Sequence, residues 1–91
     1  MSLETKTLIC SSKTNPRKLA CAIRKELDKA TSIKIYVIGA NAVNQAIKAV
    51  CYVNQRKQAI NGELPVFVYP NFSYAQVGED KVQTLISLEV R

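Results

Sequence analysis

The stretch IGANAVNQAIKAV, residues 38–50, changes its apolar period at a single glycine. In residues 32–39, which end at Gly39, apolar and polar side chains alternate and isoleucine and valine are frequent, which is typical of a β-strand. Beyond it, apolar side chains recur every three or four residues and predict a helix from about 41 to 56. A strand that turns directly into a helix restricts the chain to folds that pack helices on a sheet. The expected buried stripe of this helix is Val43, Ala46, Ile47, Val50 and Val53.

The residues before this corner follow the same strand-then-helix pattern. Residues 5–11 are partly β-branched and predict a short strand. A helix is expected from about 16 to 30, because Asn15 suits the N-cap and Pro16 suits the first helical position. One side of this helix is basic. The other is an apolar stripe of Leu19, Ala20, Ile23, Leu27 and Ala30.

The residues after the corner predict a hairpin. The loop at 61–65 contains the turn signal Asn-Gly. A strand follows at 66–77, in which Pro70 indicates either a bulge or an edge position. A turn at 78–80 leads to a strand at 81–90 whose apolar face is Val82, Thr84, Ile86, Leu88 and Val90.

The order β-α-β-α-β-β predicts one domain over residues 1–91, with residues 1–3 read as either a cloning remnant or a disordered start. Right-handed crossovers place both helices on the same face of the sheet. The expected fold is a two-layer α/β sandwich, in which a four-stranded mixed sheet carries two helices on one face. A dimer would bury part of the open face, where we expect Lys6, Lys34, Tyr36, Gln83 and Glu89.

Charge and composition narrow the classes of function. Residues 1–60 carry 11 basic and 3 acidic side chains, which fits a polyanion partner or a plain solvated surface. The chain has no histidine, no nucleophile beside a base and no glycine-rich phosphate loop, so we expect neither an enzyme nor a cofactor. Three widely spaced cysteines make a poor metal site and indicate reduced thiols; we expect Cys51 to be half-buried packing on a helix flank. No secretion signal or membrane span is evident, and the expected location is the cytoplasm.

The two predicted helix N-termini meet at one edge of the sheet, where α/β proteins bind ligands. Helix N-termini favour anions. The residues around the first N-terminus add cations, and those around the second add mainly neutral amides. The candidates are Lys13, Arg17 and Lys18 in the first corner and Asn41, Asn44, Gln45 and Lys48 in the second. Plainer interpretations are an N-cap for Asn41, a solvated face or subunit contact for Asn44 and Gln45, and solubility for the basic face of the first helix.

The stretch IGANAVNQAIKAV resembles the signature of the stage V sporulation protein S family. The Ser-Lys-x-x-Pro loop at 12–16 and the GEDK turn at 78–81 extend this resemblance over nearly the whole chain. That family resembles the Alba superfamily of dimeric chromatin and RNA-binding proteins. The resemblance implies sheet order 1-2-4-3 and nucleic-acid binding through both corners and the hairpin arm. The implied binding residues are Lys13, Asn15, Arg17, Lys18, Asn41, Asn44, Gln45, Lys48, Tyr74, Gln76 and Lys81.

This chain departs from the Alba pattern in two places. Alba proteins typically place an arginine after the glycine of the second corner, where Ala40 and Asn41 stand here, and the arm is short with little charge. The leading hypothesis is a cytoplasmic dimer that binds DNA or RNA through phosphates with little sequence preference, in a developmental or sporulation-type role. The alternative is a homo-oligomeric module that binds a protein or a small anion and no nucleic acid.

Overall fold

The computed structural model describes residues 5–29, 32–62 and 65–91. The elements in chain order are β1 (Thr5–Cys10), α1 (Pro16–Leu27), β2 (Ser32–Val37), α2 (Ala40–Arg56), a π-helical turn η1 (Lys57–Asn61), β3 (Val68–Gln76) and β4 (Val82–Val90). The first helix ends three residues before the predicted boundary at 30. Residues 1–3, and Ala30 of the predicted apolar stripe, lie outside the described residues.

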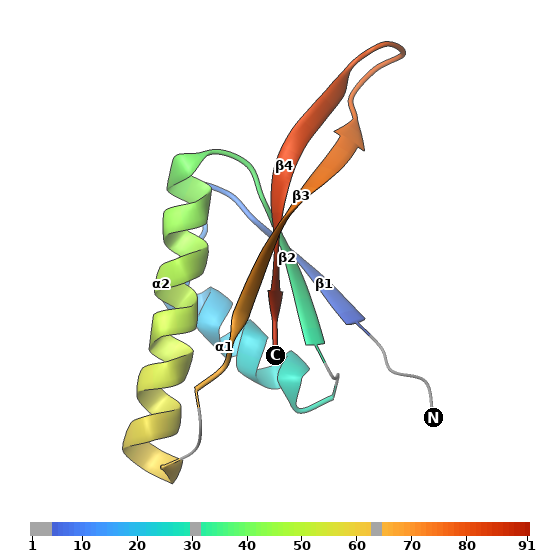
Figure 1. Cartoon of the computed structure of the whole chain (residues 1–91). Coiled ribbons are helices and arrows are strands. Elements are labelled where there is room, and N and C mark those ends of the chain that lie inside the picture. The colour runs from blue at the N-terminus through green and yellow to red at the C-terminus, as the bar shows by residue number, and fades with distance from the viewer. Residues whose placement is uncertain (1–4, 30–31, 63–64) are drawn as a thin grey trace.

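The four strands form one sheet in the order β1-β2-β4-β3, as the resemblance implied. β1 and β2 are parallel, and β4 runs antiparallel to both β2 and β3. Both helices lie on one side of this sheet, and the outer half of the β3–β4 hairpin extends past them as an arm (Figure 1). The predicted α/β sandwich is therefore confirmed. Pro70 fits because β3 is an edge strand, and its pairing with β4 runs unbroken from Val68 to Gln76.

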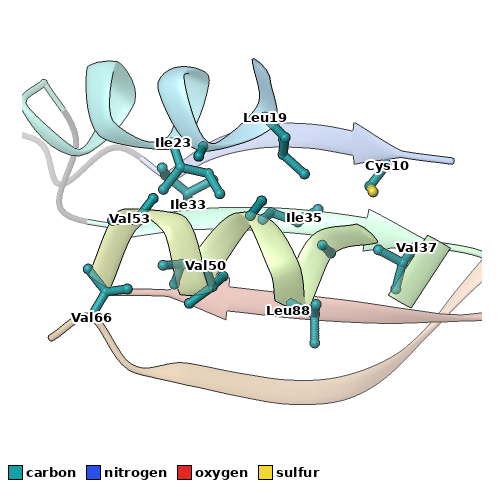
Figure 2. Packing of buried hydrophobic residues seen from close by; sticks show 14 of the residues in the cluster. Cys10, Leu19, Ile23, Ile33, Ile35, Val37, Val50, Val53, Val66 and Leu88 are labelled. Carbon is teal, nitrogen blue, oxygen red and sulfur yellow. The ribbon is translucent and has the colours of Figure 1, made fainter. Parts of the chain in front are cut away.

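The core lies between the helices and the sheet (Figure 2). Ile23 of α1 and Val53 of α2 are fully buried against Ile33 and Ile35 of β2. The predicted stripe of α2 is wrong at Ile47, which is 41% exposed. The helix instead buries a stripe of mostly small side chains against the sheet: Ala42, Ala46, Ala49 and Val53.

The two helices begin in different ways. Asn15 is the N-cap of α1, as predicted, and Pro16 is its first residue. Gly39 is the N-cap of α2, with φ 89° and ψ 157° and no side-chain cap. The N-cap interpretation of Asn41 is therefore wrong, because the glycine backbone turns the chain and starts the helix at Ala40.

The open face of the sheet is more apolar than predicted. Lys6 is paired with Ile33, so it lies on the helix side of the sheet, contrary to the prediction. Leu85 is buried although the sheet face it occupies carries no helix. On the helix side of β4 the predicted apolar face is present, but Val82 lies beyond the helices and is 65% exposed. The hairpin arm therefore shows apolar surface to solvent.

Candidate nucleic-acid interface

The first corner is a tight turn that precedes α1. The backbone N–H of Ser11 donates to Thr14 Oγ1 over 2.8 Å, and the N–H of Lys13 donates to Ser11 Oγ over 3.2 Å. Asn15 Oδ1 accepts from the N–H groups of Arg17 and Lys18. The side-chain oxygen of Asn15 is thus used by the helix cap. The side chain of Lys13 is exposed on this hydrogen-bonded turn.

The second corner lies directly beside the first. Gln45 Nε2 donates to the backbone oxygen of Ser12 over 3.3 Å, and Cys10 Sγ donates to the backbone oxygen of Ala42 over 3.4 Å. These two contacts join the end of β1 and its loop to the first turns of α2. The structure therefore brings the two predicted corner sites together, and Gln45 holds them in place.

Asn41 and Asn44 remain exposed at this second corner. Neither makes a side-chain hydrogen bond within the described residues, so both amides can reach a ligand. Lys48 is exposed one turn further along α2. The first turns of both helices contain no acidic residue, so nothing there opposes an anion.

Arg17 lies apart from the other first-corner residues. Its guanidinium carbon is 4.6 Å from the ring centroid of Tyr52 on α2, a cation–π arrangement that crosses from one helix to the other. Sequence reasoning missed Tyr52 as a partner, because 35 positions separate the two residues and no local pattern links them.

The groove between α1 and α2 is a second feature that sequence reasoning missed. It has a volume of about 450 Å³ and is lined by Arg17, Ala20, Cys21, Arg24, Tyr52, Gln55, Arg56 and Ala59. One available signal was the spacing of Arg17 and Arg24, since residues seven apart share a helix face. The contribution of Arg56 depends on how α2 is rotated, which the sequence alone does not state.

The arm residues divide into two groups. Tyr74 lines a cavity of about 510 Å³ on the open side of the sheet together with Ser11 and Ser12, so it lies near the first corner. Gln76 Nε2 instead donates to the backbone oxygen of Glu79, and Lys81 directly follows the acidic pair Glu79–Asp80. Tyr74 therefore lies near the first corner, whereas Gln76 and Lys81 lie at the turn end of the hairpin, beside the last β3–β4 pair, Gln76 with Val82.

The cysteines have different environments. Cys10 is buried, and burial raises the pKa of its thiol, while a hydrogen bond with the Thr14 side chain partly opposes that rise. Cys21 and Cys51 are exposed, so the expectation that Cys51 is half-buried is wrong: α2 turns that flank to solvent. Among the described residues, no group of three or more cysteine, aspartate or glutamate side chains is placed to hold a metal ion.

Within the described part of the chain, no helix combines the length and apolar content needed to cross a membrane. A comparison with curated proteins found no match. The family model described as Stage V sporulation protein S (SpoVS) matches residues 6–91, which include both corners and the arm. Because that match covers almost the whole chain, the protein belongs to the stage V sporulation protein S family, and this membership implies a sporulation-related role.

Proposed function

We propose that the protein is a non-catalytic, cytoplasmic regulator that binds nucleic acid at the joined corners. The observation that carries this proposal is the hydrogen bond from Gln45 to the Ser12 backbone, which ties the loop before α1 to the first turns of α2. Lys13 and Lys18 supply full positive charge there, and Asn41 adds a free amide. The N–H groups at the start of α2 have no side-chain cap, and such groups, together with cations and amides, are the usual ligands of phosphate oxygens.

Such an interface favours contacts with the phosphate backbone over reading of bases. The candidate side chains of the corner loops and first helical turns are lysines and amides, which suit phosphate oxygens and offer little apolar contact to bases. Specific recognition needs hydrogen bonds or apolar contacts to those edges. We therefore expect little preference among sequences and an affinity that falls steeply as salt is added.

We further propose that the protein acts as a homodimer. Several large apolar side chains are exposed on the arm and the sheet: Ile9, Ile38, Phe67, Tyr69, Phe72, Tyr74 and Val82. Phe72 is 73% exposed on an edge strand, where a second copy can cover it. Sedimentation equilibrium tests this point. A concentration-independent monomer would contradict it, and Phe72→Asp should shift a dimer toward monomer.

The interface is tested with a charge-matched pair of double variants. Lys13→Ala with Lys18→Ala removes two corner cations, whereas Lys25→Ala with Lys29→Ala removes one from the last turn of α1 and one just beyond it. Fluorescence anisotropy with random single-stranded and duplex oligonucleotides is measured at several salt concentrations. We expect the corner variant to bind more weakly and to lose about 1.4 to 1.8 from the slope of log affinity against log salt, from about 0.7 to 0.9 per phosphate contact.

Two results would contradict this proposal. Equal effects of the two double variants would mean that general charge, and not the corners, attracts the ligand. Absence of binding at low salt by the unaltered protein would favour the alternative, a homo-oligomeric module for a protein or a small anion.

A further inference from the structure

Three arginines line the groove between α1 and α2, and two of them, Arg24 and Arg56, lie outside the corners. Arg17 and Arg24 come from one helix and Arg56 from the other, and all three line the same cavity of about 450 Å³. Arg24 lies partly buried along its own helix, with Nη2 3.3 Å from Cys21 Sγ. Three like charges facing one hollow repel one another unless an anion enters it.

No carboxylate in the described residues balances these arginines. None of the described residues that line the groove is acidic. The ion pair found between described residues, Arg91 with Glu89, lies at the end of β4 and not in the groove. Among the described residues, the lack of a carboxylate in the groove lining distinguishes this cluster from a salt-bridged helix pair.

The groove is also partly preorganised. The Tyr52 ring lies against the guanidinium of Arg17 at 4.6 Å, which restricts a side chain that would otherwise move freely. Gln55 adds an amide between the two helices. Planar guanidiniums with five donors match the oxygens of phosphate in a paired, two-bond geometry that lysine cannot supply.

We propose that this groove is a second anion site, which takes a ligand carrying at least two phosphate groups. Three guanidiniums carry three positive charges, more than the charge of about −2 on a single phosphate group. A di- or triphosphate, or two successive phosphates of a nucleic-acid strand, matches that charge better. The ligand chemistry is therefore phosphate, and its source is either a free polyphosphate compound or a nucleic-acid backbone. The site shares Arg17 with the first-corner candidates, but Arg24 and Arg56 belong to neither corner, so these two residues test the groove apart from the corner interface.

The test compares two charge-matched variants of the full chain. Arg24→Gln with Arg56→Gln removes the groove charges, and Lys25→Gln with Lys29→Gln removes the same charge from residues outside the groove lining. Inorganic triphosphate is titrated by calorimetry, and thermal melts check that each variant folds. We expect the groove variant to lose at least about 10-fold in affinity, because each lost bond to a charged group is worth about that factor or more. The lysine variant should change by only about two-fold, as for a distant screened charge.

A third variant tests geometry against charge. Arg24→Lys with Arg56→Lys keeps the charge but loses the two-bond contacts, so it should recover only a small part of the lost triphosphate affinity. Full recovery, an equal loss in the lysine-to-glutamine control, or no triphosphate binding by the unaltered protein would each overturn the proposal.

A labelled single-stranded oligonucleotide then identifies the source of the phosphate. If the groove variant weakens binding of both probes, the site takes nucleic-acid backbone; if it weakens triphosphate binding alone, the site takes a free phosphate compound. Both results support the groove site. Failure of the corner interface would show as an unchanged Lys13→Ala, Lys18→Ala variant, so the two proposals fail separately.

Discussion

Replacing Gly39 by alanine tests whether the backbone of the second corner needs glycine. Gly39 has φ 89° and ψ 157°, a region that side chains with a Cβ essentially do not occupy. A Cβ built at this position meets no other atom within 4 Å. The cost of Gly39→Ala is therefore backbone strain alone, without any steric clash.

The magnitude follows from two opposing terms. A residue held in such a region costs about 1–3 kcal/mol of folding free energy. Alanine also reduces the freedom of the unfolded chain, which offsets about 0.4–1 kcal/mol. We expect a net loss of about 1–2 kcal/mol in the free energy of unfolding, or a melting temperature lower by about 4–16 °C for a domain of this size.

Gly62 provides a matched control at the end of η1. Its φ 61° and ψ 20° lie in the left-handed helical region, which asparagine tolerates well, and its Cβ position is also empty. Gly62→Asn should thus change stability by only about 0.5 kcal/mol, whereas Gly39→Asn should cost as much as Gly39→Ala. Urea unfolding followed by far-UV circular dichroism measures all three. If Gly39→Ala matched the unaltered protein, or if the two asparagine variants were equally stable, the strain argument would be refuted.

Two further predictions concern single side chains near the corners. Asn15→Ala should cost about 1 kcal/mol of stability, because Asn15 Oδ1 caps the N–H groups of Arg17 and Lys18; Asn15→Asp, which keeps the acceptor, should not, and an equal loss in both would contradict the cap. Because the pKa of the Cys10 thiol is raised above its ordinary 9.0, the folded state keeps the proton longer than the unfolded state. The stability contributed by this thiol should be complete below about pH 8 and decline as pH rises past 9; denaturation at pH 8 and pH 10 should show a steeper decline in the unaltered protein than in Cys10→Ala, and parallel declines would count against the burial effect.

Local chemistry was sufficient to predict the elements and their order. Strand and helix periods, the Asn15–Pro16 helix start and the turn at Gly39 each depend on neighbours within a few positions. Short connections and right-handed crossovers then leave few topologies for β-α-β-α-β-β. Each corner is a short continuous segment that follows a predicted parallel strand. Because such strands end at the same edge of the sheet, the sequence could predict that the two corners lie together.

The rotation of α2 about its axis could not be read from its sequence. Its apolar positions allow either Ile47 or Ala49 to face the sheet, and close packing chose the smaller side chains. That rotation carries Tyr52 to Arg17, turns Cys51 outward and brings Arg56 into the groove.

The amino-acid sequence by itself determined the secondary structure, the sheet order implied by its resemblance, and the places where charge is concentrated. Only the tertiary structure decided which side chains meet across elements: Gln45 with Ser12, Arg17 with Tyr52, and the three arginines around one groove. The physical reason is range. Periodicity, capping and turn chemistry act over a few bonds, whereas a contact between two helices depends on how every core side chain shares the same volume.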